Sequence, residues 1–196
     1  MRGWLTVLLL AVSAPPAGAQ CFQLAAAVTK PLQPPPTQGS ADSGERADGV
    51  VWARLRARVD RPIRAVLEVL RDPAKTPDPS LDALEVETLP SGPHLARLRL
   101  HSVVRPFPLV SVEWTEELAI DLLAGSPQEP EAVLLSYQKT AGTSHIEHLC
   151  GSTLLTRVDA SHTEVYQYEE SKITGRDVED QAKSLSDFLS LLRTKR

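Results

Sequence analysis

Apolar and polar residues alternate along most of the chain after residue 49. In the segment 51–59 the apolar side chains take every second position, and arginines fill most of the positions between them. A strand places alternate side chains on opposite faces, so this period of two predicts a half-buried strand. The same alternation predicts further strands, which span 83–89, 94–104, 109–123, 133–139, 146–158 and 163–173.

Two other segments repeat their apolar residues at helical spacing. Residues 62–72 follow Asp60, a candidate N-cap, and predict a short helix with proline in its first turn. Residues 178–192 follow Asp177 and predict a longer amphipathic helix at the end of the chain. A sheet with one apolar face needs a cover, and the last helix is the obvious one. The order of elements therefore predicts an α+β fold.

The chain begins with the three parts of a secretory signal peptide. Arg2 supplies a positive charge, residues 4–12 are apolar, and residues 17–19 are the small residues that a signal peptidase accepts. The apolar run is much shorter than the roughly 20 residues that cross a bilayer. We therefore expect residues 1–19 to be removed and the protein to be exported, either to a periplasm or into the medium.

Residues 20–48 are rich in proline, glycine, serine and charge, and they predict a linker before a single domain at 49–196. Cys21 lies just after the expected cleavage site. It leaves three alternatives open: a disulfide with Cys150, lipidation as in a bacterial lipoprotein, or a free thiol. Lipidation is the minor alternative because Gln20, rather than a small residue, precedes the cysteine.

Composition and charge exclude one class of partner. The formal net charge is −4, and this mild acidity argues against nucleic acid, which requires a basic surface. Arg97, Arg99, His101 and Arg105 do form a basic row on one face of a predicted strand. Such a row is either the solvated face of a sheet or a docking surface for anionic lipid headgroups.

Known catalytic motifs are missing from the sequence, which contains no G-x-S-x-G elbow, P-loop or G-x-G-x-x-G fingerprint. We therefore predict no catalytic residue and no cofactor. His148 and Cys150 share a strand face, but the alternation places His145 on the other face, and zinc needs three or four converging ligands. We predict no metal site and interpret His148 as a polar residue that lines a cavity.

Glu116 is the least expected residue of its strand. It shares a face with Val112, Trp114 and Leu118 in the predicted alternation. A carboxylate that faces a core is costly unless it is paired. Glu116 therefore either orients the polar head of a ligand or turns outward at a bulge or strand end.

Several stretches resemble the START-like, Bet v 1-like and polyketide cyclase superfamily, which has the helix-grip fold. VDRPIRAVLEVLRDPAK at 59–75 resembles its first strand and the helix that follows, and PFP before VSVEWTEELAI resembles a strand entry. GSTLL at 151–155 and TEVY at 163–166 resemble its penultimate hairpin. Position 153 is a departure, because many members carry an aromatic residue where this chain has threonine.

The resemblance implies a curved antiparallel sheet that wraps around a long C-terminal helix, with a cavity between them for an apolar ligand. We predict a non-enzymatic domain that binds a hydrophobic small molecule or lipid, with transient membrane contact as a further expectation. A cyclase or aromatase in the same cavity and a filled-core protein-interaction module are the alternatives. The predicted ligand-binding residues are Trp114, Glu116, Tyr137, His148, Leu185, Phe188 and Leu189.

Overall fold

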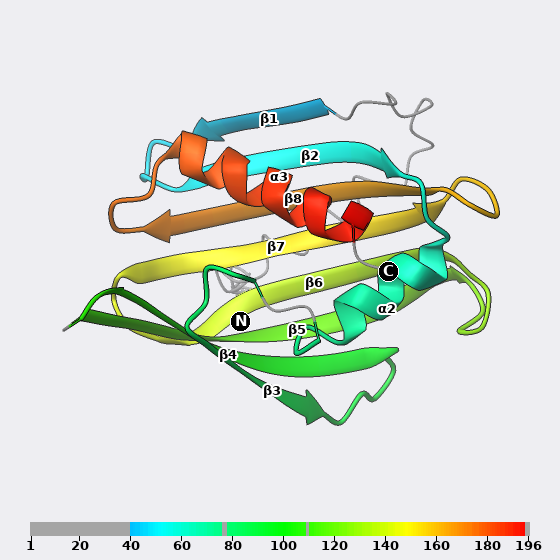
Figure 1. Cartoon of the computed structure of the whole chain (residues 1–196), viewed down its shortest axis with the longest axis horizontal. Helices are drawn as coiled ribbons and strands as arrows, with labels where there is room; N and C mark the ends of the chain where they lie inside the picture. Colours follow the sequence, from blue (N-terminus) through cyan, green and yellow to red (C-terminus); the bar gives the residue numbers. More distant parts are fainter. Residues whose placement is uncertain (1–39, 76–77, 109, 195–196) are drawn as a thin grey trace, which may run out of the picture.

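The computed structural model describes residues 40–75, 78–108 and 110–194, which form one antiparallel sheet and two helices (Figure 1). The strands are β1 (Ser40–Glu45), β2 (Val51–Val59), β3 (Ala83–Leu89), β4 (Ala96–Phe107), β5 (Val110–Gly125), β6 (Pro130–Gly142), β7 (Ile146–Arg157) and β8 (Thr163–Ile173). The helices are α2 (Ile63–Arg71) and α3 (Val178–Thr194).

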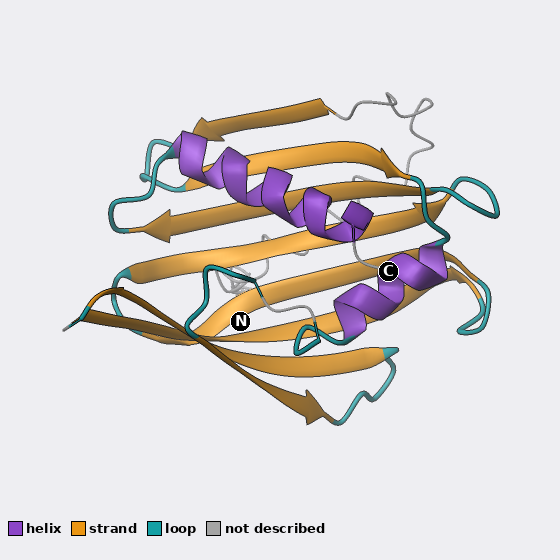
Figure 2. Ribbon diagram, in the orientation of Figure 1, coloured by secondary structure: helices purple, strands orange, loops and turns teal. Residues whose placement is uncertain are grey.

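All of these strands belong to one eight-stranded sheet, in the order β1-β2-β8-β7-β6-β5-β4-β3. Strands β3 to β8 form a meander, and β2 joins it by pairing antiparallel with β8. Both helices lie on the same side of the sheet (Figure 2). We call this side, which carries Leu55, Leu118 and Val133 of the core, the inner face, and the opposite side the outer face.

Strand β2 shows why only one face of the sheet is apolar. Its inner-face side chains, from Val51 to Val59, are buried at every second position, as the alternation predicts. On the outer face Arg54 forms an ion pair with Asp42, and Arg56 forms one with Glu164. The period of two therefore separates a core surface from a surface of paired charges.

Helix α3 begins where its sequence predicts. Oδ1 of Asp177 accepts hydrogen bonds from the backbone N–H groups of Glu179 at 2.9 Å and Asp180 at 3.0 Å. These bonds satisfy donors that the first turn of a helix leaves unpaired. The helix lies mainly against β1, β2 and β8 and buries Leu185, Leu189 and Leu192. It is the cover that the apolar face requires.

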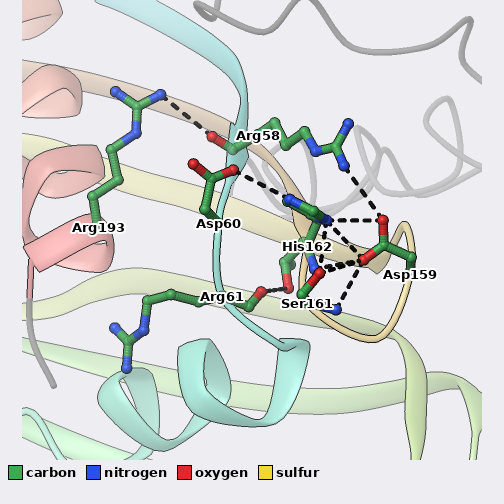
Figure 3. Close-up of polar contacts among 8 residues, drawn as sticks. Arg58, Asp60, Arg61, Asp159, Ser161, His162 and Arg193 are labelled. Atoms are coloured by element: carbon green, nitrogen blue, oxygen red, sulfur yellow. Dashed lines mark hydrogen bonds and ion pairs between the residues drawn. The ribbon is translucent and has the colours of Figure 1, made fainter.

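Helix α2 confirms the predicted short helix but not its predicted cap. Pro62 occupies the N-cap position and makes no side-chain cap hydrogen bond. The prediction that Asp60 is the N-cap is wrong, because the helix begins at Ile63 and Asp60 lies too early in the chain. Asp60 instead lies beside His162, with Oδ1 and Nε2 3.6 Å apart (Figure 3).

The turn between β7 and β8 contacts the end of β2, which in turn contacts α3 (Figure 3), and Nη2 of Arg58 lies 3.3 Å from Oδ2 of Asp159. Asp159 accepts hydrogen bonds from the backbone N–H groups of Ser161 at 2.8 Å and His162 at 3.0 Å. The bond from Ser161 and the contact with His162 lower the pKa of Asp159 below its usual value. Arg193 of α3 donates to the carbonyl oxygen of Arg58 at 3.3 Å. These contacts tie three separate elements together at one end of the sheet.

The structure differs from the predicted linker at its C-terminal end. Residues 40–45 form the edge strand β1, with Ala41 opposite Leu55 and Glu45 opposite Val51. Backbone pairing with β2 does not depend on apolar side chains, so a polar composition did not reveal this strand. Edge strands are commonly polar and charged. The predicted signal peptide at 1–19 and the linker residues 20–39 lie outside the described residues.

The remaining strands confirm the predicted meander and extend some of its members. β6 begins at Pro130 and ends at Gly142, beyond the predicted 133–139 at both ends. The α+β helix-grip fold, with a short helix after an early strand and a long C-terminal helix across the sheet, is therefore confirmed. Within the described part of the chain, neither helix is both long and apolar enough to cross a bilayer.

Candidate ligand-binding site

A cluster of polar side chains lies on the otherwise apolar inner face. It consists of Glu116 on β5, Tyr137 on β6, Glu169 on β8 and Gln181 on α3. Tyr137 and Glu169 stand on either side of Gly151 of β7, which is paired with both residues. The cluster therefore spans the inner face from β5 to β8, and the hydrogen bond between Gln181 and Glu169 ties it to α3.

Gly151 makes the contact between Tyr137 and Glu169 geometrically feasible. A Cβ atom at position 151 would lie 2.5 Å from Cζ of Tyr137, well inside van der Waals contact. Because glycine has no Cβ, the tyrosine ring lies across β7 and its hydroxyl donates a hydrogen bond to Oε2 of Glu169. The glycine is thus a space requirement of the site.

Glu169 is also bound by the helix. Nε2 of Gln181 donates to Oε1 of Glu169 at 2.6 Å, and Oγ of Ser171 donates to Oε1 of Gln181 at 2.7 Å. Nη2 of Arg176 lies 3.9 Å from Oε1 of Glu169. Glu169 and Gln181 are buried. A buried carboxylate with these partners is stabilised by hydrogen bonds that α3 helps to provide.

Glu116 has fewer partners than Glu169. Nε1 of Trp114 donates a hydrogen bond to Oε1 of Glu116. Burial raises the pKa of Glu116 from 4.5 to about 7, the Trp114 bond opposes this rise, and the charge of Glu169 adds to it. Burial and the charge of Glu169 raise the pKa of Tyr137 well above its usual value. The site therefore holds a carboxyl group that titrates near neutral pH.

Apolar side chains surround the cluster, and some of them are only partly covered. Leu118, Leu135 and Leu185 are buried next to it in the core. Several neighbours on β3, β4, β5 and α3 are packed against that core but remain half-buried, namely Val86, Leu100, Leu122 and Phe188. The inner face therefore combines accessible apolar surface with a few polar groups, which is the usual composition of a small-molecule site.

The structure brings together most of the predicted ligand-binding residues. Trp114, Glu116 and Tyr137 lie on the inner face, and Leu185, Phe188 and Leu189 of α3 face the same core. Glu116 thus points inward, which is the first of its two predicted alternatives. The register places His148 on the outer face with Cys150 and Glu170, away from the other six.

Sequence reasoning missed Glu169, Gln181 and Gly151. The sequence did contain a signal for Glu169, because the alternation of β8 places it in phase with Val165 and Thr163 on the inner face. Gln181 lies one helical turn before Leu185, so its position on the buried stripe was also visible. The need for glycine at 151 depends on how Tyr137 crosses β7, and no local pattern encodes that arrangement.

The outer face carries a second polar group. Nε2 of His148 lies 2.9 Å from Oε1 of Glu170 and 3.4 Å from Sγ of Cys150. The three possible ligand atoms lie within 4.8 Å of one another. Cys150 is disulfide-bonded, and the other cysteine of the sequence, Cys21, lies outside the described residues. A disulfide sulfur is not the thiolate that a metal site uses.

The basic row of β4 lies on the same outer face and is largely paired. Arg99 forms ion pairs with Glu87 at 2.8 Å and Glu117 at 2.9 Å, and Arg97 lies 3.2 Å from Glu117. These contacts favour the solvated-face interpretation of the row for its first two arginines. They also leave less charge for an anionic lipid headgroup.

A hollow of about 310 Å³ lies on the outer face of β2 and β8, away from the polar cluster. It is lined by Arg46, Trp52, Arg54, Tyr166 and Tyr168. The guanidinium group of Arg54 lies 5.9 Å from the centre of the Trp52 ring. Arg46 and Arg54 are paired with Asp48 and Asp42, so the positive charge of this hollow is locally compensated.

Solved structures share the fold of the chain. Human STARD10 superposes with a TM-score of 0.59 at 11% identity, covering 90% of this chain and 76% of its own. The lipid transfer and protein localization domain of human StarD13 gives 0.56 at 12% identity, covering 82% and 83%. The Zhui aromatase/cyclase from a Streptomyces species gives 0.50 at 16% identity, covering 73% and 92%.

These likenesses confirm the predicted resemblance at the level of the fold. The neighbours are START, polyketide cyclase and related proteins, so the chain has the helix-grip fold of that superfamily. No protein-family model and no curated protein matches the chain.

Proposed function

We propose that this domain binds an apolar or lipid-like ligand on its inner face, between the sheet and α3. The observation that carries the proposal is the polar cluster of Glu116, Tyr137 and Glu169 beside half-buried apolar side chains. Apolar burial supplies affinity, at about 25 cal/mol per Å² removed from water, and a few polar groups orient the ligand. The lipid transfer domains among the structural neighbours support the same class of ligand.

Native and denaturing mass spectrometry of the gently purified protein test this proposal. A bound apolar molecule, released on denaturation, is the expected result. A protein that arrives empty and stays empty when offered mixed lipids contradicts the proposal and favours the filled-core interaction module.

Tryptophan fluorescence gives a second, site-directed reading. The chain has three tryptophans, Trp4, Trp52 and Trp114, and Trp4 belongs to the segment that we expect to be cleaved. A Trp52→Phe variant therefore leaves Trp114, on the inner face, as the reporter in the mature protein. Its emission should change on ligand addition, whereas that of a Trp114→Phe variant should not.

An enzyme of the cyclase or aromatase kind is the second candidate. It is favoured by Glu116, whose pKa is raised to about 7, and by the nearby hydroxyl of Tyr137. A carboxyl group that titrates near the working pH suits general acid–base catalysis. If the isolated ligand is converted by the wild-type protein, Glu116→Gln should abolish conversion while retaining binding. Binding without conversion by the wild type supports the carrier.

Export and membrane contact complete the proposal. Export is supported by the composition of residues 1–19, and an intact mass that begins at residue 20 is the expected result. Membrane contact is supported by the tip of the β4–β5 hairpin, where Phe107 is 67% exposed and Val110 is 37% exposed. Pro106 and Pro108 at the same tip are also exposed. An exposed aromatic residue on a hairpin tip is suited to the membrane interface.

A further inference from the structure

The polar cluster contains donors that are already used and acceptors that remain. The indole of Trp114 has a single N–H, which is bonded to Glu116, and the phenol of Tyr137 has a single O–H, which is bonded to Glu169. Both of these donors are therefore occupied by carboxyl groups of the protein itself. A ligand that needs to accept a hydrogen bond finds neither of them available.

Acceptor capacity remains on the same face. Among the described residues, Oε2 of Glu116 has no hydrogen bond, and the side chain of Glu116 is only half-buried. The buried atoms Oε1 of Gln167 and Oγ1 of Thr153, on the neighbouring strands, also have no hydrogen-bond partner there. Gln167 and Thr153 are directly paired across β8 and β7, on the inner face. When Glu116 is ionised, Oε2 of Glu116 and Oε1 of Gln167 can only accept a hydrogen bond, whereas the hydroxyl of Thr153 can accept or donate one.

The charges around the site favour the same kind of ligand as its unused hydrogen-bond acceptors. The charge of Glu169 opposes the ionisation of Glu116, and the charges of both carboxylates oppose the ionisation of Tyr137. The described cation nearest to Glu169 is Arg176, at 3.9 Å, and no ion pair of Glu116 occurs in the described part of the chain. Lys139 lies opposite Glu116 in the register of β5 and β6, but the two side chains form no ion pair. A carboxylate or phosphate head would bring another negative charge beside two carboxyl groups.

We propose that the ligand of this site presents a hydrogen-bond donor, a hydroxyl or ammonium group, to Glu116 at the end of an apolar body. Lipids with a carboxylate or phosphate as their inward group are excluded. This inference rests on the proposed ligand-binding function and names the class of ligand for the same site. It does not depend on whether the ligand is carried or converted.

Three probes with the same chain length test the proposal on the mature protein: 1-decanol, its methyl ether and decanoate. Binding is measured at pH 8, where decanoate is ionised, by the fluorescence of Trp114 in the Trp52→Phe variant. We expect decanol to bind roughly tenfold more tightly than the ether, which has lost only its donor. We expect decanoate to bind more weakly than decanol by about tenfold or more, since its charge faces two carboxyl groups.

Glu116→Gln and Glu117→Gln form a matched pair of variants. The two glutamates are adjacent on β5, but Glu117 lies on the outer face with Arg97 and Arg99. Glu116→Gln removes the charge and adds a donor, so the preference for decanol over decanoate should fall toward unity. Glu117→Gln should leave that preference unchanged.

The outcomes separate this inference from the proposed function. If decanoate or the ether binds as tightly as decanol, the proposal that the ligand presents a hydrogen-bond donor to Glu116 is overturned, while ligand binding itself stands. An equal loss of preference in both glutamine variants would also overturn it, because a general charge effect would then explain the selectivity. If no probe binds and the lipid-offering experiment is also negative, the ligand-binding function itself is overturned.

Discussion

Glu116 retains its proton at a higher pH in the folded chain than in the unfolded one, where its pKa is near 4.5. Between pH 4.5 and about 7 the unfolded state therefore loses a proton that the folded state keeps. Folding stability should fall as the pH rises through this range and level off above it. In Glu116→Gln this part of the pH dependence should disappear, leaving the variant relatively more stable at pH 8 by about 1–3 kcal/mol.

Urea unfolding at several pH values measures this difference. Glu117→Gln is again the control, because its outer-face position should leave the decline between pH 4.5 and 7 in place. A constant difference between Glu116→Gln and wild type over the whole pH range would show that Glu116 does not have the raised pKa that its surroundings imply.

At Gly151 we expect a substitution to destabilise the fold, because even one added methyl group should be costly. Gly151→Ala places a methyl group against the ring of Tyr137, which must then move away from Glu169. We expect the free energy of unfolding to fall by about 1–3 kcal/mol, the usual cost of overpacking. The added Cβ would also lie 2.7 Å from the backbone carbonyl oxygen of Tyr168 on β8. A double-mutant cycle separates the two contacts, because the part of the cost due to the tyrosine ring should vanish in a Tyr137→Leu background and the rest should persist. The same cost in both backgrounds would assign the strain to the contact with the backbone of β8.

At the scale of elements, local pattern was sufficient where one element determines its own boundaries. Asp177 and the apolar stripe that ends at Leu192 predicted α3, because capping and amphipathicity are both local properties. Strand β1 was not predictable in this way. Its residues are polar, and what makes them a strand is the backbone of β2 beside them. Asp60 was misplaced because α2 begins at Ile63, after Pro62, and the carboxylate of Asp60 lies beside His162 of the turn between β7 and β8.

The β4–β5 hairpin carries the prediction for membrane contact. Phe107 lies at the tip of the hairpin, where β4 ends, and Leu123 lies near the far end of β5. Both side chains are exposed, at 67% and 48%. Phe107→Ser should weaken binding to phosphatidylcholine vesicles by about three- to tenfold, since an aromatic side chain that enters the interface is lost. Leu123→Ser should have no such effect. Vesicle co-sedimentation measures both, and an equal response of the two variants would contradict contact through this tip.

At the scale of the whole molecule, the sequence predicted the fold and half of the candidate site. Alternation and the family resemblance together indicated a sheet gripped by α3, and they placed Trp114, Glu116 and Tyr137 on its inner face. The rest of the site depends on long-range packing. Tyr137 reaches Glu169 only across Gly151, and Gln181 reaches Glu169 only because α3 lies over β8. The outward position of His148 follows from the register of β7 with β8, which its own strand does not reveal.

The domain boundary is the property of the whole molecule that composition placed differently from the structure. A domain that starts at Gly49 would lack β1, expose the edge of β2, remove the ion pair between Asp42 and Arg54, and uncover part of α3. We therefore expect a chain that begins at residue 49 to melt at a lower temperature than one that begins at residue 40, and to aggregate more readily, because a long unpaired edge promotes strand addition. Differential scanning calorimetry and light scattering on the two chains measure these effects, and both chains lack Cys21, so the disulfide contributes to neither. If the two chains melt together and remain equally monomeric, β1 adds nothing to the fold, and the domain begins where its composition changes rather than where its sheet does.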